Sequence, residues 1–366
     1  MTLVLDPCPF SLFANPRAGV PDSVVLPASG FRQARETITS WPGYAPTPLR
    51  DLPAIAQRAG VTAVRLKDEA ERFGLGSFKA LGGAYAVARL LRGRAPRAVT
   101  VTCATDGNHG RSVAWGAQRF GCRCVIFIHQ AVSPGRAEAI ARYGAEVRRV
   151  AGTYDDAVRE AARVAAAEGW FVVSDTSWPG YATVPVDVMQ GYRLMADEAV
   201  GQWHGAPPTH VFVQGGLGGA AAAVSVQMRA RYAAPPGLVV VEPDRAACLL
   251  GSARLGALTT VPGALDTIMA GLACGEPSPL AWTELERGAA AFMAVPDEAA
   301  IACMKLLAGM GIVAGESGVA GLAGFLLAAA DPAARETLGL QAASRVLLFG
   351  TEGATDPALY RRLVDG

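Results

Sequence analysis

Short runs rich in β-branched residues alternate with helix-like stretches, and this alternation restricts the possible fold more than any other feature of the chain. The helix-like stretches cover 77–91, 108–120, 134–143 and 154–167. The strand-like runs cover 61–66, 98–103, 122–128, 145–150 and 170–174. Parallel strands require long crossover connections, and these connections are almost always right-handed. The sequence therefore predicts an α/β fold in which the last four strands form one parallel sheet.

A second series of the same kind follows the first. Its helices are expected at 187–200, 218–232, 297–310 and 318–329, and its strands at 210–214, 238–242, 291–295 and 345–349. We expect two open, twisted, mainly parallel sheets flanked by helices. Because the helix at 77–91 precedes the four-strand block, a small domain (93–187) is predicted to be inserted into a large one (1–92 and 188–366). The first fifty residues are rich in proline and are expected to be irregular.

Charge and cysteine content exclude several classes of protein. Lys and Arg total 33 against 32 Asp and Glu, so no field steers the chain toward nucleic acid or an anionic membrane. The longest apolar run, 321–330, is too short to cross a bilayer, and residues 1–7 lack a secretory pattern. Seven irregularly spaced cysteines favour a reduced, cytoplasmic chain, although Cys248 and Cys274 could pair.

A glycine-rich turn leads directly to Lys79. Residues 74–79 read Gly-Leu-Gly-Ser-Phe-Lys, and the helix behind them is apolar. A lysine on a helix is usually a solvated surface charge. A desolvated lysine at the start of a helix has a lowered pKa and is nucleophilic enough to form an imine with an aldehyde. Phe78 fits either a core position or a wall that stacks on a ring.

A glycine run lies between a predicted strand and an alanine-rich helix. It consists of Gly215, Gly216, Leu217, Gly218 and Gly219. Its simplest interpretation is a left-handed turn. Its backbone N–H groups and the helix N-terminus would also bind a phosphate. The run equally fits a dinucleotide fingerprint with Glu242 as the ribose-binding acid. Lys79 and Asn108 favour the phosphate of an aldehyde cofactor, because a hydride-transfer enzyme does not explain them.

Residues 104–110 read Ala-Thr-Asp-Gly-Asn-His-Gly where a predicted strand ends and a helix begins. An Asp/Asn-rich turn with a helix cap is one interpretation. Alternatively, the exposed amides suit a substrate carboxylate, and the Asn108 side chain suits a phenolate oxygen on a cofactor ring. The candidate substrate-binding residues are Ala104, Thr105, Asp106 and His109. The four histidines lack metal-ligand spacing, so no metal site is predicted.

These segments resemble those of the fold-type II pyridoxal-phosphate enzymes over about residues 40–360. Further matching stretches are 175–181 (Asp-Thr-Ser-Trp-Pro-Gly-Tyr), 189–192, 268–277, 315–318 and 351–356. Within that group the chain is most similar to the diaminopropionate ammonia-lyases, to which the stretches around Asp175 and Cys274 are specific.

The resemblance implies a role for individual residues. Lys79 would hold pyridoxal phosphate covalently, Asn108 would contact the ring hydroxyl and the glycine run would hold the phosphate. Thr351 would lie by the pyridine nitrogen, and Glu316 would belong to the shell behind the ring. The resemblance also implies a small amino-acid substrate and a homodimer.

Asp106 departs from the ordinary dehydratases, which have a small hydroxyl residue at this position. A β-amino group must leave as neutral ammonia, so a carboxylate facing it could hold the ammonium and act as acid or base. Asp175 offers a second carboxylate, or else a turn cap after Ser174. We therefore expect elimination of the α-proton and the β-amino group from 2,3-diaminopropionate of either enantiomer.

Other functions remain open. Gly215, Gly219 and Pro179 differ from the residues usual in the lyase. A same-fold serine or threonine dehydratase, or a β-replacement enzyme acting on another β-substituted amino acid, is the second hypothesis. A dinucleotide-dependent oxidoreductase is a distant third, and a non-catalytic cofactor-binding scaffold is the fourth.

Overall fold

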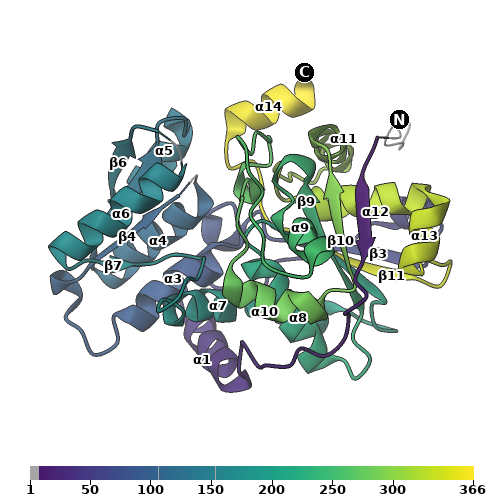
Figure 1. Cartoon of the computed structure of the whole chain (residues 1–366), viewed down its shortest axis with the longest axis horizontal. Coiled ribbons are helices and arrows are strands. Elements are labelled where there is room, and N and C mark those ends of the chain that lie inside the picture. The colour runs from purple at the N-terminus through teal and green to yellow at the C-terminus, as the bar shows by residue number, and fades with distance from the viewer. Residues whose placement is uncertain (1–7, 106, 153) are drawn as a thin grey trace. The chain divides into compact units, whose positions relative to one another are not determined.

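The computed structural model describes residues 8–105, 107–152 and 154–366. Within these residues the chain has an α/β fold with one seven-stranded and one four-stranded sheet. Each sheet belongs to a separate compact unit (Figure 1). The large unit comprises the described residues up to Val25, Pro46–Glu71 and Met195–Gly366, and the small unit comprises Leu26–Ala45 and Arg72–Leu194.

The sheet of the large unit is parallel in its centre and antiparallel at both edges. Its strand order is β1-β10-β9-β8-β11-β3-β2. The parallel strands are β10 (Ala291–Val295), β9 (Gly237–Pro243), β8 (His210–Gln214), β11 (Arg345–Gly350) and β3 (Ala63–Asp68). The edge strands β1 (Ser11–Ala14) and β2 (Leu49–Asp51) run opposite to their neighbours. The expected mainly parallel sheet is confirmed.

The helices of the large unit supply most of its core side chains. They include α2 (Pro53–Ala59), α8 (Gly219–Arg231), α9 (Cys248–Leu255), α10 (Pro279–Gly288), α11 (Asp297–Ala308), α12 (Ala320–Ala330), α13 (Pro332–Leu338) and α14 (Pro357–Asp365). Helix α12 is apolar on every side and lies directly on the sheet. A Cβ atom at Gly321 would lie 2.9 Å from the Phe212 carbonyl oxygen, so glycine is required for this approach.

The sheet of the small unit is entirely parallel, as predicted. Its order is β6 (Glu146–Val150), β5 (Arg123–His129), β4 (Thr100–Ala104) and β7 (Phe171–Val172). The helices around it are α4 (Asn108–Phe120), α5 (Pro134–Ala141) and α6 (Tyr154–Glu168). Val125 and Phe127 of β5 pack against α6, whereas Ile126 between them lies against Gly110 of α4. The strand is therefore buried on both faces, as its continuous apolar sequence indicates.

The small unit is larger than the expected domain 93–187. It also contains α1 (Ala28–Thr39), the 3₁₀ turn η1 (Arg72–Gly74), α3 (Ala80–Leu90) and the first part of α7 (Thr183–Gln202). The reason is that α3 packs closely on α4. A Cβ atom at Gly116 would lie 2.7 Å from Cα of Ala84, so the two helices touch through glycine. Both units are consequently discontinuous in sequence.

The expectation that the first fifty residues are irregular is wrong, because they contain β1 and α1. The buried residues of α1 are Phe31, Ala34 and Ile38, at a helical spacing within a mostly polar sequence.

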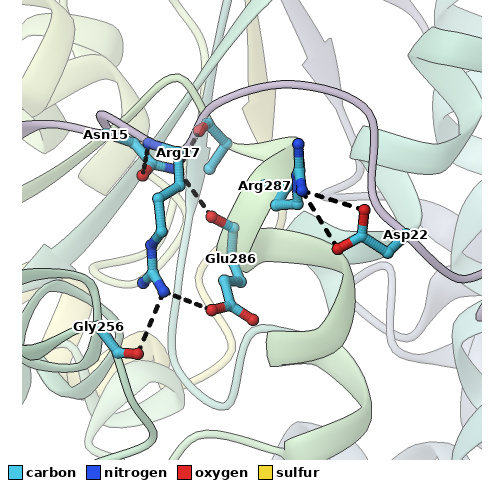
Figure 2. A network of polar contacts seen from close by, with 7 residues as sticks. Asn15, Arg17, Asp22, Gly256, Glu286 and Arg287 are labelled. Atoms are coloured by element: carbon cyan, nitrogen blue, oxygen red, sulfur yellow. Dashed lines mark hydrogen bonds and ion pairs between the residues drawn. The ribbon is translucent and has the colours of Figure 1, made fainter.

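The N-terminal segment also makes a polar network with the end of α10, which Figure 2 shows. Arg17 Nη1 lies 2.5 Å from Glu286 Oε1. Asn15 Nδ2 donates to the carbonyl oxygens of Glu286 (2.9 Å) and Ala289 (2.8 Å). Asp22 pairs with Arg287 at 3.0 Å. Carbonyl groups at the end of α10 thus find donors on a distant segment.

Candidate active site

The candidate residues follow the carboxyl ends of parallel strands in both units. Thr105 and Asn108 follow β4, Asp175 follows β7, and Thr351 follows β11. The glycine run connects β8 to α8. Ligands of open α/β sheets bind at this edge. Asp106 lies outside the described residues.

A strained turn places Lys79 at the start of α3. Phe73, Gly74 and Gly76 have φ values of 52°, 69° and 76°. Glycine adopts this left-handed conformation easily, whereas it is unfavourable for phenylalanine. Packing holds Phe73 in place, since the centroids of the Phe73 and Trp115 rings are 5.0 Å apart. Lys79 is the residue that immediately precedes the helix.

Lys79 forms an ion pair with Asp175, 96 residues away in the sequence. Its Nζ lies 2.6 Å from Asp175 Oδ2, and the two side chains are 20% and 12% exposed. Burial acts to raise the pKa of Asp175, but the interactions with His109 and Lys79 outweigh it and hold this pKa well below its ordinary value. Asp175 is therefore an ionised acceptor that stabilises the ammonium form of Lys79.

His109 lies beside this pair. Its Nε2 is 2.7 Å from the Val173 carbonyl oxygen, which can only accept, so Nε2 carries the hydrogen. Burial lowers the pKa of His109, an effect that Asp175 opposes and Lys79 reinforces. Nδ1 lies 3.6 Å from Asp175 Oδ2. In its neutral form the ring presents a lone pair, not a donor, on the side of Asp175.

Tyr181 fixes the segment that carries Asp175. Its hydroxyl donates to the Val172 carbonyl at 2.8 Å and accepts from the Ser174 N–H at 3.0 Å. Its ring stacks on Trp178 with a centroid distance of 4.0 Å. The Ser174 hydroxyl, rather than Asp175, accepts from the Thr176 N–H. The sequence assigned no role to Tyr181, although it ends the matching stretch 175–181.

Thr105 organises the loop before α4. Its hydroxyl oxygen accepts from the backbone N–H groups of Gly107 and Gly110, both at 3.0 Å. Oδ1 of Asn108 accepts from Arg111 at 2.5 Å. Ala104 is the last residue of β4 and is half-buried. Thr105 thus shapes the loop through its side chain, independently of any substrate.

Phe78 belongs to the core of the small unit. Its side chain is buried, and its ring centroid lies 4.6 Å from that of Tyr192. Nζ of Lys79 lies 5.3 Å from the Phe78 ring and 5.5 Å from the Tyr192 ring. The lysine amine is therefore bordered by two aromatic rings as well as by Asp175.

The glycine run of the large unit forms a turn whose inner surface is backbone. Gly218 has a φ of 92° and precedes α8, which has no side-chain cap. A Cβ atom at Gly216 would lie 3.2 Å from Cα of Leu272 and 3.3 Å from Sγ of Cys274. A side chain at this position would crowd these neighbouring atoms. The arrangement is suited to an anion, because backbone N–H groups and the helix N-terminus attract negative charge.

Thr351 is joined to the glycine run through Gln214, the last residue of β8. Nε2 of Gln214 donates to Thr351 Oγ1 at 2.7 Å and to the carbonyl oxygens of Gly318 (2.9 Å) and Phe349 (2.8 Å). Because Thr351 Oγ1 accepts from Gln214, its own hydrogen can be donated elsewhere. The sequence assigned no role to Gln214, although it directly precedes the run.

Glu316 lies in a buried segment that links three of the matching stretches. It is 3% exposed. Ser317 Oγ accepts from the Gly271 N–H, and Glu352 Oε1 accepts from the Ser317 N–H, each at 3.0 Å. The stretches 268–277, 315–318 and 351–356 therefore form one structural group within the large unit.

Glu242 does not have the ribose-binding role considered from the sequence. It is fully buried, and its two oxygens accept from the N–H groups of Leu249 (2.8 Å) and Leu250 (2.7 Å) at the start of α9. Burial raises its pKa to about 8 against these hydrogen bonds. The carboxylate is occupied as a helix cap, which contradicts the dinucleotide interpretation. Cys248 beside it is a free thiol.

Among the described residues, no group of three or more His, Cys, Asp or Glu could hold a metal ion. None of the helices that the structure describes combines the length and the apolar character that a membrane span needs.

Comparisons with known proteins point to one family. The model of the pyridoxal-phosphate dependent enzymes matches residues 40–348. The chain is 39% identical over 370 residues to diaminopropionate ammonia-lyase of Escherichia coli, with 93% of each protein covered. It is 37% identical to that of Salmonella typhimurium, covering 88% of this chain and 89% of that protein.

Solved structures agree with the sequence comparison. The holo diaminopropionate ammonia-lyase of E. coli has a TM-score of 0.92 at 36% identity, covering 99% of this chain and 98% of that one. The same enzyme in complex with D-serine has a TM-score of 0.90 at 36% identity, covering 97% of each chain. Threonine deaminase isoform 2 of Solanum lycopersicum, at 21% identity and a TM-score of 0.79, shares the fold.

Proposed function

The chain belongs to the pyridoxal-phosphate dependent enzymes and, within them, to the diaminopropionate ammonia-lyases, and we propose that it eliminates the β-amino group of 2,3-diaminopropionate. The products are pyruvate and two molecules of ammonia. The similarity to the E. coli lyase along nearly the whole chain carries this proposal. The ion pair between Lys79 and Asp175 supports it, because it places an amine and an acid together.

The residues present fit pyridoxal phosphate. Added Cβ atoms in the glycine run would crowd neighbouring protein atoms, so the run stays free of side chains at Gly215, Gly216 and Gly218, and α8 begins there without a side-chain cap. We propose that this run binds the phosphate, Thr351 donates to the ring nitrogen and Asn108 contacts the ring hydroxyl. Glu316 would contribute to the shell behind the ring, and Lys79 would bind the aldehyde carbon. When bound, the cofactor supplies an electron-withdrawing ring that stabilises negative charge at the substrate α-carbon.

Lys79 must change its partner during the reaction. As an ammonium it is held by Asp175, and it becomes a nucleophile only after its Nζ loses a proton. A neutral Nζ that is not engaged with the cofactor could accept the α-proton of the substrate. Asp175 Oδ2, released from Lys79, can then accept a proton or bind a cationic group.

We propose that Asp106 binds the β-ammonium group and keeps it protonated until it leaves as ammonia. This role follows from leaving-group chemistry, since an amide ion is a far poorer leaving group than ammonia. Ala104, Thr105 and His109 would border the same substrate. Two carboxylates, Asp106 and Asp175, allow proton transfer on either side of the α-carbon, and we therefore propose that both enantiomers react. The D-serine complex of the E. coli enzyme supports binding of D-amino acids.

The test is a substrate panel on the purified holoenzyme. Both enantiomers of 2,3-diaminopropionate should give two ammonia for each pyruvate, whereas serine, turned over by a dehydratase, gives one. Asp106→Asn should keep the visible cofactor absorbance but lower ammonia release by at least about 10²-fold. Asp365→Asn, at an exposed position in α14, is the matched control. Full turnover of both enantiomers by Asp106→Asn would show that the assigned role is wrong, and faster turnover of serine or threonine would favour the dehydratase.

We further propose that the enzyme is a cytoplasmic homodimer, as the family resemblance implies. The large share of cysteines that are buried free thiols, such as Cys103 and Cys303, supports a reducing environment. Light scattering of the holoenzyme tests the dimer, and a single species with the mass of one chain would contradict it.

A further inference from the structure

Tyr192 occupies a slot that glycine residues open beside Lys79. It lies on α7, is 1% exposed and packs on Phe78. A Cβ atom at Gly82, one helical turn after Lys79 in α3, would lie 2.4 Å from Cε1 of the Tyr192 ring. A Cβ atom at Gly191 would lie 2.0 Å from the Leu81 carbonyl oxygen. The glycines of α3 and α7 thus admit the whole tyrosine ring next to the lysine.

The Tyr192 hydroxyl is buried and satisfies the geometry of a hydrogen bond with no described residue. Most buried hydroxyl groups have a partner, so an exception in a native structure needs an explanation. Tyr181 in the same unit shows the ordinary case, with one bond donated and one accepted. Burial raises the pKa of Tyr192 well above its usual range; the nearby Lys79 opposes this rise and Asp175 adds to it. The hydroxyl therefore keeps its proton and is a donor.

The neighbours of Lys79 differ in what they can offer its nitrogen. The ionised Asp175 only accepts hydrogen bonds, which suits the ammonium form. His109 has its hydrogen on Nε2, committed to Val173, so its Nδ1 also only accepts. A neutral lysine amine has a lone pair that needs a donor. Among the described neighbours Asp175, His109 and Tyr192, the Tyr192 hydroxyl can supply this donor.

Resting on the proposed function, we propose that Tyr192 is a positioning residue that donates a hydrogen bond to Nζ of Lys79 when this amine is neutral. Asp175 holds the charged form and Tyr192 holds the reactive form. The phenol thereby favours loss of the proton from Lys79, and the bond must break before the lone pair attacks. Tyr192 makes no covalent bond and transfers no group.

The chain is well suited to a direct test, because Lys67, Lys79 and Lys305 are its three lysines. Reductive methylation of the cofactor-free protein with formaldehyde and cyanoborohydride, read residue by residue by mass spectrometry, reports the neutral fraction of each amine against pH. Lys305 is half-buried on α11 and serves as the internal reference. This measurement needs neither cofactor nor substrate.

Tyr192→Phe removes the hydroxyl oxygen and keeps the ring. Loss of one hydrogen bond to the amine should reduce methylation of Lys79 about five- to tenfold on the acidic side of its profile, without changing Lys305. In the holoenzyme the visible absorbance and KM should stay near their wild-type values. The value of kcat should fall about five- to tenfold, and the acidic limb of the profile of kcat against pH should move to higher pH. Tyr85→Phe is the matched control, because this buried tyrosine of α3 interacts with Asp187, Arg89 and Arg92 instead.

Each outcome decides the proposal. An unchanged Lys79 profile in Tyr192→Phe overturns it, and so does the same shift in Tyr85→Phe. Loss of folding in Tyr192→Phe also overturns it, since the oxygen would then have a structural partner. If Tyr192→Phe shifts the methylation profile of Lys79 but the wild-type enzyme does not turn over diaminopropionate, the proposed function fails and the role of Tyr192 stands.

Discussion

The candidate residues of the two units differ in kind: the small unit contributes titratable side chains, and the glycine run of the large unit contributes backbone groups. In the small unit, Lys79, His109 and Asp175 are titratable side chains that lie next to one another, and Lys79 is paired with Asp175. The glycine run of the large unit, which we propose binds the cofactor phosphate, offers backbone N–H groups, and these do not titrate. The small unit should therefore respond to changes of charge, and the large unit to changes of volume.

Removal of the amine should have the largest effect. Lys79→Ala should abolish the visible absorbance of the bound cofactor and lower kcat/KM for diaminopropionate by at least about 10³-fold, because both covalent attachment and a proton carrier are lost. Borohydride reduction followed by peptide mass spectrometry should place the cofactor on residue 79 of the wild type. Lys305→Ala is the control. Covalent cofactor on another residue of the wild type would contradict this assignment.

A change of charge without a change of shape tests Asp175. Asp175→Asn should lower turnover of one enantiomer by about 10²-fold more than that of the other, because only one enantiomer would place its α-proton on the Asp175 side. The measurement is kcat/KM for each enantiomer separately. Asp187→Asn alters another paired carboxylate of the small unit, which contacts Arg89 at 3.1 Å, and should leave the ratio unchanged. Equal losses for both enantiomers would argue against separate roles for the two acids.

A change of volume without a change of charge tests the glycine run. Gly216→Ala places a Cβ atom against the backbone of Leu272 and should weaken cofactor binding about tenfold, through loss of phosphate contacts. The methylation profile of Lys79 in the cofactor-free protein should not change. Gly201→Ala, in α7 of the same unit with no atom within 4 Å of the added Cβ, is the matched control. Equal affinity of Gly216→Ala and Gly201→Ala for the cofactor would remove the phosphate role from Gly216.

Glu242 is an exception to this difference between the units, because it is a titratable side chain that lies beside the glycine run of the large unit. Its folded-state pKa of about 8 lies above its ordinary value of 4.5, so the folded protein binds the proton more tightly. Its stabilising contribution is complete below about pH 4.5 and declines as pH rises to about 8, by at most roughly 1.4 kcal/mol per pH unit.

Urea unfolding of wild type and Glu242→Gln across this range measures the effect. The variant should show a smaller decline of unfolding free energy with pH, whereas Glu336→Gln at an exposed position should follow the wild type. Parallel curves for wild type and Glu242→Gln would mean that Glu242 stays ionised throughout.

The sequence predicted the elements whose periodicity is strong and local. The limits of β8, β10 and α4 agree with those expected at 210–214, 291–295 and 108–120. Short elements such as β2 and α9 were not expected, because three to eight residues carry little periodic signal and tertiary packing stabilises them. For α1, polar residues around Phe31, Ala34 and Ile38 concealed a helical face.

The candidate site was less accessible to sequence reasoning than the fold. The residue types of Lys79 and the glycine run carry recognisable chemistry, so their segments could be chosen directly. The pairing of Lys79 with Asp175 depends on β4 and β7 being neighbours, which strand periodicity does not reveal. Tyr192 gave no signal beyond its matching stretch, and Glu242 suggested a ribose because its cap on α9 arises only in three dimensions.

Since we propose that the glycine run binds the cofactor phosphate, the polar network in Figure 2 should connect the N-terminal segment to cofactor retention. Helix α10 is held by the N-terminal segment at one end, and at the other the Ser278 N–H donates to the Leu217 carbonyl of the glycine run at 2.9 Å. Val20 and Val24 in that segment are 74% and 81% exposed, which makes it open to proteolysis. Proteolytic cleavage there would release the C-terminal end of α10. We therefore expect the cleaved protein to lose the visible absorbance of its cofactor faster on dialysis than the intact protein does.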